Sequence, residues 1–478
     1  MAPEAGAALS GGYGLRTRPA RFSFRIMTWS TRRLRWAATC GGAVLACVAA
    51  APRPARANGA FPDEFSVHFP PDTPHRILVG ANFGLLVSED DGATWRYSCE
   101  PWIVAGSNAA VNPESSVLFY QVTTDGVLLA DAVNITRSAD HACTWPTTTQ
   151  GEVITDIFAA PTDAGLVLAI VAVANGSYIV ASHDGGKSFD PAHLYDTADL
   201  LTGVEIARSD PAVMYATSVQ TSGNGSALLQ STDSGRTWTP HDLHTASGTQ
   251  PRIMAVDPVD KGTIYLRELT GVTDAIAIAT NGGEDVRTVL GINGSFTSFV
   301  RATDGALYAG TSGGQLHVRP AGAADFLPPR PAPHLRCLGQ RLGEAKRIYA
   351  CGDFLRDGYS LFFTDDGGQT FTPVMKFTDL LGPLTCGPVT TNCAAHWERI
   401  KGVLGIGAPA DAGQSGGGGG GGGSSGGGSH CASLGADALA LLFLLGFALR
   451  ATRRSASQLH PVPAELHPDA GSVRNSID

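Results

Sequence analysis

A few acidic side chains in loop-like stretches are the residues of this sequence that could cleave a glycosidic bond. Asp125 lies in TTDG at 123–126, and Asp353 and Asp357 lie in DFLRDG at 353–358. A glycoside hydrolase needs two carboxyl groups that face each other across the scissile bond at a set separation. An aspartate in such a run is more commonly a solvated turn residue. The catalytic residues therefore stay unknown, and the sequence favours a protein without catalytic activity, with a glycoside hydrolase as the alternative.

Arginines and tyrosines offer a second kind of chemistry. A sialidase holds the carboxylate of its substrate with three arginines, attacks with a tyrosine beside a glutamate, and uses an aspartic acid. Such enzymes normally carry the motif F-R-I-P in the N-terminal part of their sequence, and this motif is missing here. The similar run HRIL at 75–78 is interpreted as the start of a strand. The residue types alone are present, at Arg76, Arg208, Arg252, Arg301, Tyr215, Tyr265 and Tyr308.

Metal and cofactor motifs are weak. HDLH at 241–244 could place two histidines near a metal, but no third ligand is apparent. Asp90 and Asp91 lack the spaced oxygen ligands and the terminal Glu of a calcium loop. The sequence GQSGG at 413–417 fits G-x-S-x-G only inside a glycine run that cannot form a nucleophile elbow. We expect no metal and no cofactor.

An eight-residue box, S-x-D-x-G-x-T-W, recurs along the chain and indicates a repeated fold. Its starting positions are 44 to 50 residues apart, until a last gap of 85 residues that is close to two repeats. Seven repeats result, and the sixth has lost its box near 319–326. The copies are SEDDGATW (88–95), SHDGGKSF (182–189), STDSGRTW (231–238), TDDGGQTF (364–371), the weaker SADHACTW (138–145) and the degenerate ATNGGEDV (279–286).

Each type of residue in the box suits a turn. The aspartate can accept hydrogen bonds from its own turn, the glycine can adopt a positive φ, and the final aromatic residue can pack between repeats. We therefore assign the box a structural role. Its residues are Ser88, Asp90, Gly92, Trp95, Ser138, Asp140, Trp145, Ser182, Asp184, Gly186, Phe189, Ser231, Asp233, Gly235, Trp238, Asp366, Gly368 and Phe371.

Strand-like runs lead into each box. RILVGAN (76–82), VMYATSV (213–219) and RIYACGD (347–353) are followed by a short polar loop and a second strand. Such runs, broken by Gly, Asn and Asp, predict antiparallel hairpins. A period of 40 to 50 residues with about four short strands is typical of propeller blades. The predicted fold class is all-β, a seven-bladed β-propeller over 58–377.

The box and its spacing resemble the Asp-box, or BNR repeat, over about residues 60–377. It is shared by sialidases, xyloglucanase-type glycoside hydrolases, the sortilin luminal domain and a photosystem II assembly factor. The resemblance implies that the box joins the third and fourth strands of a blade, on the face away from the ligand, and it leaves function open. The ligand face would then carry the loops between second and third strands, which are Asn82–Gly84, Thr123–Gly126, Asn175–Ser177, Thr221–Gly225, Thr311–Gly314 and Asp353–Gly358.

The ends of the chain read as sorting signals. Residues 1–57 contain basic residues, an apolar run and the A-x-A sequence at 55–57, which predict a secretory signal with a true start at Met27. A lipobox-like reading, VLAC with acylated Cys47, is the competing interpretation. Export, to the outer surface or outer membrane of a Gram-negative bacterium, is the expected localisation.

A Gly/Ser-rich linker (409–430) precedes a C-terminal segment (431–454) with a short apolar run and an arginine cluster. Twelve apolar residues are too few for a helix to span a bilayer of about 30 Å. The arrangement resembles the MYXO-CTERM sorting tails of myxobacterial surface proteins, which implies processing or lipid attachment at Cys431. The polar tail 455–478 is expected to be disordered, and a plain membrane anchor is the alternative.

Six cysteines outside the signal and Cys431 suggest disulfides, because the chain is expected to be exported. Fifteen pairings are possible, and pairing nearest neighbours would give 99 with 143, 337 with 351, and 386 with 393. The candidates are Cys99, Cys143, Cys337, Cys351, Cys386 and Cys393. Residues 378–408 should form a small cap that disulfides hold, with a helical pattern from Cys393 to Val403.

The net charge of -9 argues against a nucleic-acid partner, since most such binding depends on basic surfaces. The loops on the predicted ligand face are short and rich in Gly, Ser, Thr and Asn, which suits hydrogen bonding to a glycan or a peptide. We expect a non-catalytic module that binds a glycan or protein at the propeller mouth and is held to a membrane through its C-terminal segment.

Overall fold

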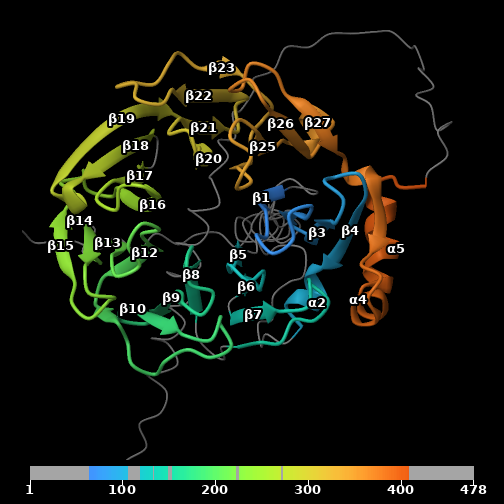
Figure 1. Ribbon diagram of the computed structural model, residues 1–478, viewed down its shortest axis with the longest axis horizontal. Coiled ribbons are helices and arrows are strands. Elements are labelled where there is room, and N and C mark those ends of the chain that lie inside the picture. Colours follow the sequence, from blue (N-terminus) through green and yellow to red (C-terminus); the bar gives the residue numbers. More distant parts are fainter. Residues whose placement is uncertain are drawn as a thin grey trace, which may run out of the picture. The chain divides into compact units, whose positions relative to one another are not determined.

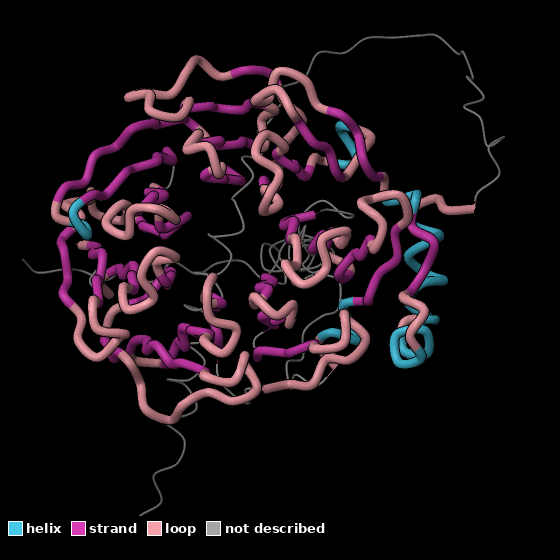
Figure 2. The backbone as a smooth tube through the Cα atoms, in the orientation of Figure 1, coloured by secondary structure: helices cyan, strands magenta, loops and turns pink. Residues whose placement is uncertain are grey.

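The computed structural model describes residues 64–105, 119–132, 134–148, 153–221, 225–270 and 273–407. The predicted secretory signal, the linker, Cys431 and the polar tail lie outside these residues. Strands dominate the described chain, and the longest helices lie at its C-terminal end (Figure 2). Among the helices of these residues, none is both long and apolar enough to cross a membrane.

The strands form seven antiparallel sheets, here called blades 1 to 7 in chain order (Figure 1). Blade 1 contains β1 (Glu64–His68), β2 (Ile77–Ala81), β3 (Gly84–Ser88) and β4 (Trp95–Cys99). Blade 2 contains β5 (Phe119–Val122), β6 (Leu128–Ala132) and β7 (Asn134–Ser138). Blade 3 contains β8 (Val153–Ala159), β9 (Val167–Val173), β10 (Gly176–Ser182) and β11 (Tyr195–Thr197). In blade 2 the bridge between Thr136 and Thr147 stands where a fourth strand would lie.

Blades 4 to 7 have four strands each. Blade 4 contains β12 (Leu200–Ile206), β13 (Met214–Val219), β14 (Ser226–Ser231) and β15 (Thr239–Asp242), and blade 5 contains β16 (Gln250–Val256), β17 (Ile264–Leu269), β18 (Thr273–Thr280) and β19 (Asp285–Asn293). Blade 6 contains β20 (Phe296–Arg301), β21 (Leu307–Thr311), β22 (Gln315–Arg319) and β23 (Arg330–Pro331), and blade 7 contains β24 (Cys337–Gly339), β25 (Ile348–Cys351), β26 (Leu361–Thr364) and β27 (Thr372–Met375). Short helices are α2 (Glu100–Ile103), α3 (Phe354–Asp357) and the 3-10 helices Asn281–Gly283 and Phe377–Asp379.

The blades close into a ring. The first strand of each blade contacts the first strands of both neighbours, in the order β1, β5, β8, β12, β16, β20, β24 and back to β1. These first strands surround the axis of the ring, and the fourth strands lie at its rim (Figure 1). The predicted seven-bladed β-propeller is therefore confirmed.

One buried hydrophobic cluster lies at each of the seven interfaces between neighbouring blades. Because a blade is covered on both faces, some of its middle strands are apolar throughout instead of alternating. β2 (ILVGA) is buried at every position, and β9 (VLAIVAV) at all positions but its last. The outer strand β19 (DVRTVLGIN) has no buried residue. The apolar runs of the sequence thus mark the middle of each blade.

The residues that follow blade 7, from 380 to 403, pack against the outer strand of blade 1 and close the ring there. β28 (Leu380–Pro383) pairs in parallel with β4, and α4 (Gly387–Asn392) and α5 (Ala394–Val403) follow it. Ile400 on α5 is fully buried in the cluster between blades 7 and 1, and Trp397 packs against that cluster. The helix predicted from Cys393 to Val403 is therefore present, and it belongs to the seam where the chain ends of the propeller meet.

The disulfides connect Cys99 with Cys393, Cys143 with Cys386, and Cys337 with Cys351. Of the three nearest-neighbour pairs, only that of Cys337 with Cys351 is correct. The pairings of 99 with 143 and of 386 with 393 are wrong, because ring closure brings together residues that are 294 and 243 positions apart, at the rim of blades 1 and 2. We call β28, α4, α5 and these two long-range disulfides the clasp.

Candidate functional site

The antiparallel order of the strands defines two faces of the ring. Loops between first and second strands and between third and fourth strands emerge on one face, which carries the boxes and is here called the box face. Loops between second and third strands and the links between blades emerge on the other, here called the mouth face. The turn predicted near 319–326 does lie between the third and fourth strands of blade 6, β22 and β23.

One predicted loop lies on the wrong face. Thr123–Gly126 joins β5 and β6, the first and second strands of blade 2, and so lies on the box face. The second strand of this blade, β6, ends at Ala132, and the third, β7, begins at Asn134. A hairpin pattern shows that two strands are paired but not which place in the blade they take. The other predicted loops do connect second and third strands.

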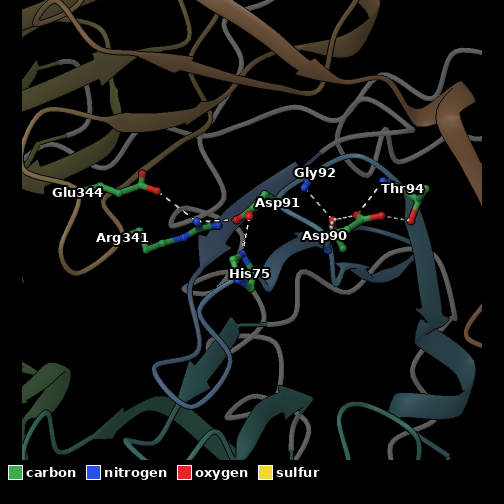
Figure 3. A network of polar contacts seen from close by, with 8 residues as sticks. His75, Asp90, Asp91, Gly92, Thr94, Arg341 and Glu344 are labelled. Carbon is green, nitrogen blue, oxygen red and sulfur yellow. Dashed lines mark hydrogen bonds and ion pairs between the residues drawn. The ribbon is translucent and has the colours of Figure 1, made fainter.

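The boxes are networks of local hydrogen bonds. The hydroxyl of Ser88 donates to Asp90 Oδ1 over 2.9 Å and accepts the N–H of Gly92 over 2.8 Å. Asp90 in turn accepts the N–H and the hydroxyl of Thr94 over 2.8 and 2.7 Å (Figure 3). The same pattern of a hydroxyl and a carboxylate recurs around Asp140, Asp184, Asp233 and Asp366. These aspartates are engaged in holding turns.

These hydrogen bonds lower the pKa of the box aspartates. Hydrogen bonds from the hydroxyl and N–H of Thr237 hold the pKa of Asp233 at about 2. The charged form is the one that accepts these bonds, so a group of this kind stays ionised down to that pH. An aspartate with such a pKa is poorly suited to donate a proton near neutrality. The box aspartates therefore serve structure.

The aromatic residue of each box packs against the preceding blade. Trp95 lies in the cluster between blades 7 and 1, and Trp145 in the cluster between blades 1 and 2. Phe189 packs in the same way between blades 2 and 3, Trp238 between blades 3 and 4, and Phe371 between blades 6 and 7. The box glycines have positive φ, and in blade 2 Ala142 takes this position at φ 68°.

A polar contact joins the first and last blades on the box face. Arg341, from the loop between β24 and β25, donates to Asp91 Oδ1 over 2.7 Å and to Glu344 Oε1 over 3.1 Å (Figure 3). The other carboxylate oxygen of Asp91 lies 2.6 Å from His75 Nδ1. The guanidinium also stacks over two rings, those of Phe69 and Tyr349. The box face at this seam is thus built to hold the ring closed.

The three carboxylates proposed for glycoside hydrolysis do not face each other. Asp125 accepts a hydrogen bond from Thr123 on the box face. Asp353 caps α3 by accepting the N–H groups of Leu355 and Arg356. Asp357 accepts the N–H of Asp353 over 2.8 Å in the same loop. These residues shape loops and do not form a catalytic pair.

The arginines and tyrosines of the sialidase hypothesis are also dispersed. Arg76 pairs with Glu89 in blade 1 at 2.9 Å. Arg301 pairs with Asp257 at 2.9 Å, and the hydroxyl of Tyr265 donates to the same carboxylate. Tyr215 and Tyr308 lie at the box-face ends of their strands, where Tyr215 donates to a backbone carbonyl of blade 5, and Arg208 follows the end of β12 on that face. Of the four arginines, Arg252 alone belongs to the group described next.

Three side chains from the first strands of three blades meet near the axis. The guanidinium of Arg252 on β16 lies 5.7 Å from the ring centroid of Phe119 on β5, and 3.6 Å from Asp156 Oδ1 on β8. Phe119 is 46% exposed, and Arg252 and Asp156 are partly exposed. Phe119 and Arg252 lie in the first half of their strands and Asp156 lies at the middle of β8, and all three strands begin at the mouth face. We call Phe119, Asp156 and Arg252 the axial site.

A second carboxyl group lies below the axial site. Asp156 accepts the N–H of Val204 on β12 over 2.9 Å, and Glu205 accepts the N–H of Val256 on β16 over 2.8 Å. Each acid thereby covers an N–H group at the edge of the next blade's first strand. Burial raises the pKa of Glu205 to about 8, and the negative charge of Asp156 acts in the same direction. Burial also raises the pKa of Asp156.

This raised pKa predicts a pH dependence of stability. A carboxyl group whose pKa is higher in the folded chain lowers the free energy of unfolding as the pH rises from about 4.5 to about 8. We expect Glu205→Gln, which keeps an acceptor for Val256, to raise the melting temperature at pH 8 and to change it little at pH 5. The exposed Glu398→Gln is the matched control and should show no such pH dependence. Equal effects of Glu205→Gln at both pH values would contradict the prediction.

Of the residues at and below the axial site, the sequence patterns pointed to Arg252 but not to Asp156, Glu205 or Phe119. The available signal was a charged residue inside an otherwise apolar strand, as in VITDIFA and LLTGVEI. In HDLH, His241 is partly buried and His244 is exposed. In the part of the chain that the structure describes, no group of three or more His, Cys, Asp or Glu side chains is placed to hold a metal ion.

The closed ring of antiparallel blades defines the class of this protein as a seven-bladed β-propeller. No protein-family model matches the sequence, and no curated protein matches it. The chain is similar to several solved structures. YCF48 from Cyanidioschyzon merolae is 13% identical, with a TM-score of 0.42, over 63% of this chain and 94% of that one.

Two glycoside hydrolases of family GH74 are similar at the same level. The enzyme of Niastella koreensis is 16% identical, with a TM-score of 0.39, over 66% of this chain and 46% of that one. The xyloglucanase of Xanthomonas campestris is 15% identical, with a TM-score of 0.36, over 66% of this chain and 52% of that one. This chain thus spans about half the length of these two enzymes. At such identities the likeness concerns the fold alone.

Proposed function

We propose that this protein is an exported β-propeller that binds a glycan at its mouth face without cleaving it. The observation that carries the proposal is the axial site, where an exposed aromatic ring lies beside a guanidinium and a carboxylate. The ring of Phe119 offers an apolar face to the C–H groups of a sugar. Arg252 and Asp156 offer a donor and an acceptor for its hydroxyl groups. A few polar groups around an apolar surface are typical of small-molecule sites.

The lack of catalysis is proposed because the loop carboxylates of the mouth face are engaged in shaping loops. The alternative, a glycoside hydrolase, is favoured by one observation. Glu205, with its pKa raised to about 8, lies near Asp156 and would be protonated at neutral pH, as a general acid must be. Against this, both acids accept backbone N–H groups of neighbouring blades.

Export and attachment to the cell surface belong to the same proposal. Three disulfides suit an oxidising compartment, which agrees with the secretory signal expected in residues 1–57. We propose that the boxes are Asp-boxes, because all five good or weaker copies share one hydrogen-bond pattern. We further propose that the C-terminal segment is a MYXO-CTERM-like tail that attaches the protein to a membrane through Cys431.

The test is to incubate the purified protein with a mixed glycan library and to identify retained glycans and new products by mass spectrometry. We expect retention without new products. Phe119→Ala and Arg252→Ala should each weaken retention about 10-fold or more, as residues at the centre of a binding site do. Leu327→Ala, an exposed residue in the blade 6 turn on the box face, is the control and should change nothing.

Each other outcome is informative. Products that increase with time and protein concentration, and that disappear in Glu205→Gln, would support the glycoside hydrolase. If no glycan is retained and none is cleaved, the glycan proposal is wrong, and a protein ligand becomes the hypothesis to test.

A further inference from the structure

A groove borders blade 5, between the link that follows blade 4 and strands β17 to β19, and its lining reaches from the mouth face to the box-face end of blade 5 and to Arg319 of blade 6. It arises because β15 has only four residues whereas the neighbouring outer strand β19 has nine, so the link to β16 leaves blade 4 early. The volume of the groove, about 1070 Å³, is large enough for a ligand of several sugar units. Its lining includes His244, Thr249, Glu268, Thr270, Thr273 and Thr288.

The lining of the groove is rich in hydroxyl groups. Four of these six residues are threonines, and the carboxylate of Glu268 lies 3.5 Å from the hydroxyl of Thr288. Thr249 is 5% exposed, and its hydroxyl has no hydrogen-bond partner within the described residues. A buried hydroxyl without a partner is unfavourable and is expected to take one from a ligand or an ordered water. Burial of Glu268 raises its pKa, which shows a partly desolvated acceptor.

The groove continues the axial site along one strand. Thr249 directly precedes β16, and Arg252 is the third residue of that strand. At about 3.3 Å per residue the two positions are about 10 Å apart along the chain, a span that an oligosaccharide of a few units covers. A ligand of a few sugar units that rests on Phe119 and Arg252 is therefore long enough to reach Thr249.

We infer that the groove binds further units of the glycan whose first unit occupies the axial site, so that the ligand is an extended, hydroxyl-rich oligosaccharide. This inference rests on the proposed function. The hydroxyl of Thr249 and the carboxylate of Glu268 recognise sugar hydroxyls, and the hydroxyls of Thr270 and Thr273, which are hydrogen-bonded to each other, extend this polar wall.

The inference predicts that affinity increases with ligand length. The probe is a size-fractionated mixture of neutral oligosaccharides, from disaccharides to octasaccharides, made by partial acid hydrolysis of several polysaccharides. Immobilised full-length protein should retain longer chains better. Glu268→Gln and Thr249→Val should each weaken retention of the long chains about 3- to 10-fold, the size of a lost hydrogen bond, and leave the shortest chains unchanged. Thr303→Val, at an exposed residue on the box face, is the matched control.

The outcomes separate the inference from the proposed function. Phe119→Ala should weaken retention at every length. If short and long chains are retained equally, or if Glu268→Gln and Thr249→Val leave the length dependence unchanged, the groove is not part of the site, although glycan binding stands. If no fraction is retained, the proposed function fails together with the inference. Melting curves of each variant show whether a loss reflects binding or unfolding.

Discussion

Replacing Cys386 and Cys393 together by serine is expected to lower the free energy of unfolding by about 5–8 kcal/mol. This removes two disulfides, one between Cys386 and Cys143, which are 243 residues apart in sequence, and one between Cys393 and Cys99, which are 294 residues apart. A disulfide that closes a long loop restricts the unfolded chain strongly, and a native one contributes about 2–5 kcal/mol. Since a domain is stable by about 5–15 kcal/mol, the double variant should be close to unfolding.

Each single variant, Cys386→Ser or Cys393→Ser, should lower the free energy of unfolding by less than half as much as the double variant. With either disulfide intact, the long loop is still closed, and only the shorter circuit between the two bonds is lost. The double variant should therefore lose more than the sum of the single ones. Denaturant unfolding followed by tryptophan fluorescence measures these differences. Cys337→Ser with Cys351→Ser is the control, because this bond spans 14 residues inside blade 7. An unchanged unfolding midpoint in the double variant would show that the clasp does not hold the ring.

Asp274→Ala is expected to destabilise the protein by about 3–5 kcal/mol. Asp274 is fully buried, contacts Arg267 Nη2 at 2.7 Å, and accepts the N–H of Phe296 in blade 6 over 2.8 Å. Removing one member of a buried ion pair takes the counter-charge from the other in a region of low polarity. The variant also removes the acceptor for a backbone group of the next blade, so blades 5 and 6 should separate more easily.

Asp365→Ala is the matched control for this prediction. Asp365 forms two hydrogen bonds with Arg347 at 2.9 and 2.8 Å, but both side chains are exposed. An exposed pair of this kind contributes at most about 1 kcal/mol. Unfolding midpoints measured in parallel test the contrast. A loss in Asp274→Ala no larger than that in Asp365→Ala would mean that burial does not determine the worth of this ion pair.

The fold could be predicted because the box is encoded locally. In Ser88, Asp90, Gly92 and Thr94, every bond joins residues two or four positions apart. Such a pattern is visible in a single stretch of sequence, and its period counts the blades. The place of the sixth repeat was predicted from that period alone, and the structure has its turn between β22 and β23.

The axial site and the two long-range disulfides could not be predicted because they depend on closure of the ring. Phe119, Asp156 and Arg252 come from three blades, and only closure brings their first strands around one axis. Cys99 meets Cys393 for the same reason. The error at Thr123–Gly126 is different in kind, since there the hairpin was recognised and its place within the blade was not.

The clasp also determines how the propeller would respond to a mechanical pull. Tension applied to the chain beyond residue 407 first meets α5 and then Cys393, and the covalent bond to Cys99 carries it directly into blade 1. The second bond, between Cys386 and Cys143, extends the load to blade 2. The non-covalent strands of blade 7 lie outside this path. A propeller tethered by its C-terminal end could therefore hold a glycan under tension, such as on a moving surface, without its last blade being peeled away.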